Sequence, residues 1–282
     1  MQESDNKSLT FGKGLPASCL HRPNSPEADP KTRIQPAFTI LSDRPSIHMP
    51  HHDSSVQSDA LPDALLLATT GGLLDAIVYL NHGHVFANAM TGNVIFLGIA
   101  VLGHHWGEII PHLIPLIGFF AGVTTSKHLR TRLGIRSVLL GLGLEIAAIF
   151  VLGWLPRSFP EMAFTGIVAY VAAIQVASFR RIDRFAYNST FVTGNLRDVA
   201  EGLYEALSPA ATPEAREKGR AQARALGLIC LCFLAGAVLG AWAAPRFGNY
   251  SLWLAEPPLL IVAALSFRRP ATLAPQTSTD SQ

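Results

Sequence analysis

Three acidic residues stand inside long apolar segments, where a charge is costly. Asp75, Glu145 and Glu256 each interrupt such a segment, and an ionised side chain at the centre of a membrane helix costs about 2.5–3.5 kcal/mol on insertion scales. Carboxyl groups kept at that cost are typical of proton or cation handling. Alternatively, Asp75 extends its carboxylate toward the membrane surface or caps the end of its segment, and Glu256 helps to open the chain before a Pro-Pro pair. Glu145 lies deepest in its segment and is therefore the strongest functional candidate of the three.

The tripeptide Thr-Gly-Asn occurs twice, each time just after an apolar segment. The copies are Thr91-Gly92-Asn93 and Thr193-Gly194-Asn195. Glycine permits a backbone turn, while Thr and Asn side chains can cap amide groups that lipid could not satisfy. We therefore expect both copies to lie in broken or re-entrant helices. The predicted binding site for a small solute or ion combines the six residues of the two copies with Glu145, Asp75 and Gln175.

Further polar residues allow a functional and a structural interpretation. Gln175 could contribute to that site or form a hydrogen bond between helices. Arg197 and Asp198, directly after the second Thr-Gly-Asn, could pair with a buried acid or lie on an interfacial helix face. The chain has no Walker loop, zinc-protease pair, nucleophile elbow or dinucleotide fingerprint. We therefore expect no enzyme, no catalytic residue, no cofactor and no metal site.

Five histidines cluster around the ends of the first three apolar segments. They are His82, His84, His104, His105 and His112. A metal or pH-sensing site is conceivable there. However, no helical histidine spacing and no carboxylate partner supports it in the sequence.

The composition indicates which elements must position these residues. Of 282 residues, 49% are hydrophobic and 15% are charged, against about 25% charged in typical soluble domains. Apolar segments follow one another at about 61–81, 85–103, 109–125, 137–155, 162–179, 225–244 and 251–267, most of them near the length of about 20 residues that crosses a bilayer. A further segment at 185–206 is too polar to face lipid. The net charge of +2 gives no indication of nucleic-acid binding.

The two ends of the chain are polar. Residues 1–60 contain seven prolines and no apolar run that could serve as a signal-peptide core, so we expect a disordered, uncleaved leader. We expect a disordered tail at 270–282. The domain between them, 61–269, is predicted to be an all-α polytopic membrane bundle.

The sequence predicts that the membrane domain is an internal duplication. The first repeat spans about 61–155 and the second about 162–267. Phe119-Phe120-Ala121-Gly122 follows the first Thr-Gly-Asn, and Phe233-Leu234-Ala235-Gly236 follows the second. The second repeat has an insertion in the hydrophilic tract 208–224, which fits a short solvated helix or loop. Small residues recur every fourth position in both repeats (Gly118, Gly122 and Ser126; Cys232, Gly236 and Gly240), a pattern that favours close helix packing within the chain or between protomers.

Lys and Arg near the membrane set the orientation. If all eight segments cross, the two sides carry 8 and 7 of these residues. If both Thr-Gly-Asn segments enter and leave on one side, six spans remain and the counts become 14 and 2. The six-span arrangement places both termini in the cytoplasm and the two repeats in opposite orientations. A seven-span alternative, in which 85–103 also crosses, scores almost as well.

Several motifs resemble the YoaK-like family of uncharacterised bacterial membrane proteins. They are Gly-Leu-Leu-Asp-Ala at 72–76, Gly-His-Val-Phe at 83–86, Asn-Ala-Met-Thr-Gly-Asn at 88–93, Phe-Leu-Gly at 96–98 and Val-Thr-Gly-Asn at 192–195. Gln175 stands where the family usually shows Gln-Asn, and Val176 replaces the Asn. The resemblance covers about 62–270 and implies a multi-pass protein of the bacterial inner membrane, without indicating a substrate.

Two functions remain open from the sequence. The first is a permease for a small solute or ion, with a polar site at the membrane midplane. The second is a non-transporting assembly or regulatory subunit. The expected partners are the lipid bilayer, an unknown small solute or ion and, for the glycine stripes, a second copy of the chain.

Overall fold

The computed structural model describes residues 60–268 apart from 135, 183–184 and 191. The leader predicted at 1–60 lies outside the described residues except for Ala60, and the tail predicted at 270–282 lies outside them entirely. The fold below therefore concerns the predicted membrane domain.

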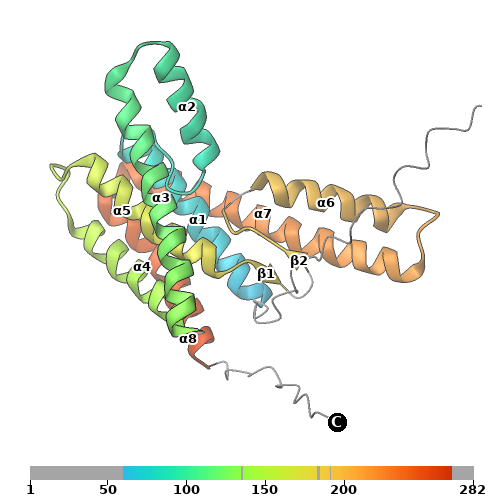
Figure 1. Ribbon diagram of the computed structural model, residues 1–282. Helices are drawn as coiled ribbons and strands as arrows, with labels where there is room; N and C mark the ends of the chain where they lie inside the picture. Colours follow the sequence, from blue (N-terminus) through green and yellow to red (C-terminus); the bar gives the residue numbers. More distant parts are fainter. Residues whose placement is uncertain (1–59, 135, 183–184, 191, 269–282) are drawn as a thin grey trace, which may run out of the picture. The chain divides into compact units, whose positions relative to one another are not determined.

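Eight α-helices make up most of the described chain (Figure 1). A 3-10 helix, Gly248–Ala255, joins the last two of them. Two short strands, β1 (Arg181–Ile182) and β2 (Phe185–Ala186), pair antiparallel ahead of the sixth helix. The helices are α1 (Leu61–Asn81), α2 (Met90–Leu102), α3 (Trp106–Leu133), α4 (Arg136–Trp154), α5 (Glu161–Ser178), α6 (Val192–Leu207), α7 (Pro213–Phe247) and α8 (Glu256–Arg268).

The helices have the length and composition of a multi-pass membrane protein. Among the described residues, α1, α3, α4 and α5 can each cross a membrane, and so can the stretch Pro213–Arg268, which contains α7, the 3-10 helix and α8. Helix α2 is apolar but has 13 residues, about 20 Å at 1.5 Å per residue, against a bilayer core of about 30 Å. Helix α6 carries the charges that excluded it from lipid in the sequence. These features confirm the predicted all-α membrane bundle.

Two predicted boundaries differ from the structure. The apolar segment expected from residue 85 becomes helical only at Met90, because residues 82–89 form a loop. The charged tract 208–224, expected as a separate short helix or loop, is from Pro213 onward the start of α7, which runs for 35 residues. This tract is rich in Ala, Glu, Lys and Arg, which are strong helix formers. The Thr212 hydroxyl caps it by accepting a hydrogen bond from the Ala215 N–H at 3.2 Å.

Helix α1 packs against α7 through glycines on both sides. A Cβ atom at Gly72 would collide with the Phe233 carbonyl, and one at Gly236 would collide with the Thr69 carbonyl. At Gly240 a Cβ would lie 2.6 Å from the Leu73 carbonyl oxygen. The two backbones are therefore in direct contact, as is typical of small-residue stripes in membrane helices.

Helix α3 packs in the same way against α5. A Cβ at Gly118 would lie 2.6 Å from the Gly166 carbonyl oxygen, and one at Gly122 would collide with the Tyr170 carbonyl. Ser126 and Ser178 hydroxyls are 3.2 Å apart and share a hydrogen bond. The sequence prediction that these stripes mediate packing is confirmed, and the packing is within the chain.

The apolar core lies where α1, α4, α5, the 3-10 helix and α8 meet. Leu67, Ile149, Phe164 and Leu252 are each fully buried there. On α4, Glu145 has the same near-zero exposure as Leu142 and Ile149, which lie three and four residues away and so share its helix face. The core therefore positions an acid among apolar side chains.

Candidate functional site

The first Thr-Gly-Asn places a single side chain in the interior. Asn93 is fully buried, and its amide binds the backbone of a residue seven positions earlier: Nδ2 donates to the Phe86 carbonyl at 2.8 Å, and Oδ1 accepts from the Phe86 N–H at 2.9 Å. Thr91, in contrast, is exposed. The asparagine thus ties the loop 82–89 to the first turn of α2.

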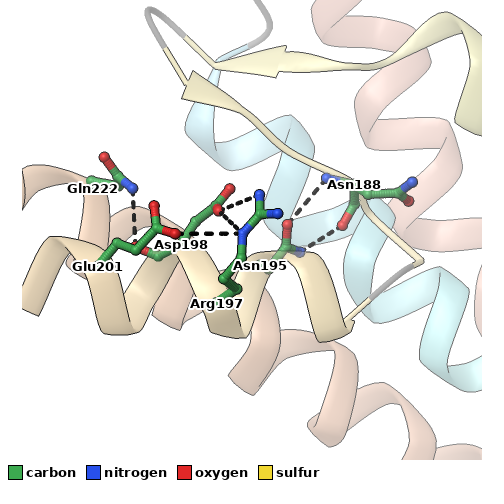
Figure 2. A network of polar contacts seen from close by, with 6 residues as sticks. All are labelled: Asn188, Asn195, Arg197, Asp198, Glu201 and Gln222. Atoms are coloured by element: carbon green, nitrogen blue, oxygen red, sulfur yellow. Dashed lines mark hydrogen bonds and ion pairs between the residues drawn. The ribbon is translucent and has the colours of Figure 1, made fainter. Parts of the chain in front are cut away.

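The second Thr-Gly-Asn repeats this geometry (Figure 2). Asn195 Nδ2 donates to the Asn188 carbonyl at 2.7 Å, and its Oδ1 accepts from the Asn188 N–H at 3.2 Å. Asn195 is buried, whereas Thr193 and Gly194 are exposed. In both copies the asparagine amide therefore bonds to the chain's own backbone. The role this geometry gives to both asparagines is to position a loop.

Asp75 is joined to the first of these loops. It is buried on α1, and its Oδ1 accepts the Asn88 N–H at 2.7 Å, while Oδ2 has no hydrogen-bond partner. The Asn88 side chain in turn donates to the Gly71 carbonyl at 3.5 Å. The structure thus brings Asp75 and the loop held by Asn93 into one polar cluster at α1.

Glu145 and Glu256 form a second acidic cluster, between α4 and α8. Glu145 is completely buried, and neither of its carboxyl oxygens has a hydrogen-bond partner. Glu256, at the first position of α8, lies close enough for its charge to act on Glu145, and its Oε1 also lacks a partner. The sequence identified both acids but not their proximity, since no local pattern relates residues more than a hundred positions apart.

Gln175 is the remaining predicted site residue. It lies on α5 with 2% of its surface exposed, and its Nε2 has no hydrogen-bond partner. Gln175 is therefore a buried amide whose N–H donor is available for a hydrogen bond. Helix α5 packs against α4, the helix of Glu145.

Arg197 and Asp198 lie side by side on α6, where Arg197 is exposed and Asp198 is partly buried (Figure 2). The guanidinium donates to Asp198 Oδ1 at 2.8 and 2.9 Å and is 3.7 Å from Glu201. The Gln222 amide of α7 donates to the Asp198 carbonyl at 3.0 Å. These contacts favour the helix-face interpretation of the arginine over pairing with a buried acid.

Histidines at the end of α1 lie in different surroundings. His82 is buried: its ring stacks on Phe164 with centroids 3.7 Å apart, and its Nε2 is 3.1 Å from the Asn249 side-chain oxygen. Burial lowers the pKa of His82 below its usual 6.5. His84 is exposed and contacts the Tyr79 carbonyl at 3.1 Å. Within the described residues, no group of three His, Cys, Asp or Glu side chains is placed to hold a metal ion.

Comparisons with known proteins agree with the membrane fold. The family described as "Protein of unknown function (DUF1275)" matches residues 64–265. The chain is 29% identical over 204 residues to the "UPF0700 transmembrane protein YoaK" of Bacillus subtilis (strain 168), an alignment that covers 70% of this chain and 88% of that protein. No solved structure matches the chain.

Proposed function

The chain belongs to the DUF1275 family, and we propose that it is a permease for a small solute or ion, without enzymatic activity. The observation that carries the proposal is Glu145, a fully buried carboxyl group whose two oxygens have no hydrogen-bond partner. A structural acid would be expected to be paired or hydrogen-bonded. An acid left without partners is available to a proton or a cation.

The energetics of the Glu145–Glu256 cluster support this reading. An ionised carboxylate without a partner is very unfavourable in an apolar interior, and two neighbouring carboxylates repel each other. The cluster is therefore relieved when a proton or a cation is bound, and strained when it is empty. Such a difference between loaded and empty states is what a carrier needs in order to change conformation with its cargo.

The helix pairing supports the duplicated architecture in which such a site would work. We take α1 to α4 as one repeat and α5 to α8 as the other. The first helix of each repeat then packs on the third helix of the other, as the α1–α7 and α3–α5 pairs show. The two asparagine clamps match at the same seven-residue spacing.

In this proposal the six spans are α1, α3, α4, α5, α7 and the 3-10 helix continued by α8. Both termini lie in the cytoplasm, and the two repeats are inverted across a bacterial inner membrane. Inverted repeats commonly form their binding sites at the membrane midplane between them. The asparagine clamps would hold α2 and α6 at their starting points while the spans rearrange around Glu145, Glu256, Asp75 and Gln175.

The alternative, an assembly or regulatory subunit, loses one of its supports. It relied on the stripes around Gly122 and Gly236 as surfaces for another protein. Both glycines instead contact helices of the same chain, at Tyr170 and Thr69. The permease is therefore the better supported of the two functions.

Flux through liposomes containing the purified protein tests the proposal. The liposomes contain a pH-sensitive dye, a membrane potential is set with K⁺ and valinomycin, and proton entry is recorded; Na⁺ and K⁺ entry are recorded in parallel. We expect wild-type protein to conduct at least one of these ions and Glu145→Gln to reduce that flux to the level of empty liposomes. Glu217→Gln, which removes an exposed acid from the polar start of α7, is the control and should match wild type.

Size-exclusion elution of each variant separates loss of flux from loss of folding. A correctly folded Glu145→Gln protein with full flux would refute the role of this acid. Wild-type protein that conducts none of the three ions above the background of empty liposomes would refute the permease as stated.

A further inference from the structure

A cavity of about 490 Å³ lies at the end of the bundle where α1 finishes and α3 and α5 begin. Ligand pockets are typically about 300–1,000 Å³, so this volume suits a small molecule. It is lined from four helices and one loop, by Tyr79 of α1, His84 of the loop, Phe96 of α2, Glu108 and His112 of α3, and Glu161 of α5. None of these residues belongs to the acidic clusters of the proposed permease.

Aromatic rings form part of the cavity wall. Tyr79 packs against His84 with ring centroids 5.2 Å apart and stacks on Phe86 at 4.9 Å. Phe96 stacks on His112 at 5.3 Å. These contacts hold the rings of Tyr79 and Phe96 in place on the cavity wall.

The charge of the cavity is negative. Glu108 and Glu161 are both exposed, and among the described residues no Lys or Arg lines the cavity. The nearest ion-pair partner of Glu108 is His105, at 3.7 Å on the open surface. The charges of Glu161 and Arg157 both act on His82, but neither His82 nor Arg157 is among the lining residues. The two carboxylates are exposed and meet no Lys or Arg side chain on the described part of the cavity wall, so the cavity attracts cations.

His112 provides an independent sign of a ligand. About nine-tenths of its surface is buried, and its Nδ1 has no hydrogen-bond partner. Buried polar atoms are normally satisfied. The unsatisfied Nδ1 of His112, a residue of the cavity wall, is therefore available to form a hydrogen bond with a polar group of a ligand.

We propose that this cavity binds a small organic cation of the substituted ammonium class. Carboxylates supply the opposite charge, and Tyr79 and Phe96 supply aromatic rings of the kind whose faces attract ammonium groups. A bare metal ion fits less well, because no three His, Cys, Asp or Glu side chains of the described residues are placed to coordinate one. An anion would meet two carboxylates without a compensating cation. This assignment does not depend on transport and holds whether or not the acids at α4 and α8 carry ions.

Choline and its uncharged carbon isostere 3,3-dimethylbutan-1-ol are the probes that test the assignment. They are added to purified full-length protein in detergent at pH 8, where histidine is neutral, and the unfolding temperature and the heat of binding are measured. We expect choline to raise the unfolding temperature and the isostere to leave it unchanged. The double variant Glu108→Gln/Glu161→Gln should weaken choline binding by roughly tenfold or more, and Phe96→Leu should also weaken it.

Glu217→Gln removes one acid outside the cavity and should bind choline as wild type does. Each variant is compared with wild type for its unfolding temperature without probe, so that a misfolded variant is recognised. Equal stabilisation by choline and the isostere would show that the positive charge does not contribute to binding and that the cavity is only an apolar pocket. This result would overturn the proposal. The proposal would also fail if choline did not bind at millimolar concentration, or if the double variant bound it as tightly as wild type.

Discussion

Helices α2 and α6 begin alike and then diverge. Each starts with Thr-Gly-Asn, and in each the asparagine amide clamps the backbone seven residues earlier. Beyond the clamp, α2 exposes Val94, Ile95 and Ile99, whereas α6 exposes Arg197 and Glu201 together with Leu203. The shared part faces the protein, and the divergent part faces the surroundings.

This difference shows which residues are required by the fold and which are determined by the surroundings of each helix. A buried asparagine that satisfies a loop cannot be replaced without leaving backbone groups unpaired, so both helices need it. The outward faces make no such bonds. In the proposed inverted arrangement they lie at opposite sides of the membrane, and each can suit a different neighbour. If so, damage to the shared parts should have equal effects in the two regions.

The largest effect is expected at the α1–α7 and α3–α5 helix contacts, which support the two regions. Gly236→Leu should lower the free energy of unfolding by about 3 kcal/mol or more, because α7 must move away from α1 to make room. Gly122→Leu should cost a similar amount at the α3–α5 contact. The measurement is the unfolding temperature in detergent. Gly227→Leu on α7 and Gly143→Leu on α4 are matched controls, since a Cβ at either meets nothing within 4 Å. Tolerance at only one contact would show that the two pairs are not equivalent.

A smaller, matched loss is expected at the clamps. Asn93→Ala and Asn195→Ala each remove two hydrogen bonds to a loop and should each cost about 1–3 kcal/mol. Thr91→Ala and Thr193→Ala change exposed neighbours and should stay within about 0.5 kcal/mol of wild type. Thermal unfolding of the four variants gives the comparison. A clear inequality between the two asparagines would contradict a common structural role.

The smallest effect is expected in the pH dependence of stability, which should involve the loop before α2 and not the loop before α6. His82, in the loop before α2, has a pKa lowered by burial, whereas the loop at 179–191 before α6 contains no histidine. Below about pH 6.5 the unfolded chain binds a proton at His82 more readily than the folded chain does, so stability is full above that pH and falls as the pH decreases.

His82→Gln tests this pH dependence. The unfolding temperature of the variant should drop less than that of wild type between pH 7 and pH 5. His128→Gln, at an exposed position of α3, should leave the pH dependence as in wild type. An unchanged pH profile for His82→Gln would assign the acid sensitivity to other groups.

Features with a local signature could be predicted from the sequence. The sequence predicts the first span at 61–81, and α1 occupies Leu61–Asn81. This agreement follows because polar residues on both sides of an apolar run define where the helix begins and ends. The stripes around Gly122 and Gly236 could also be predicted, because small residues at every fourth position indicate close helix packing. Helix α7 was harder, because its polar start and its apolar remainder look like separate elements although both favour helix.

The polar contacts could not be predicted in the same way. The bond from Asn93 to Phe86 depends on the path of a loop, which no periodic pattern describes. The proximity of Glu145 to Glu256 depends on how α4 meets α8. The cavity could not be predicted for the same reason: the sequence shows the histidines, but the aromatic and acidic residues around them come from four different helices.

The pairing of α1 with α7 has a consequence for biosynthesis. Helix α3 can find α5 soon after it leaves the ribosome, but α1 must wait until α7 has been made, more than 130 residues after its own last residue. During that delay the glycine face of α1 lacks its permanent neighbour. Chains truncated before α7 should therefore be substrates for membrane proteases or bind an insertase, which makes the first helix to enter the bilayer among the last to reach its final place.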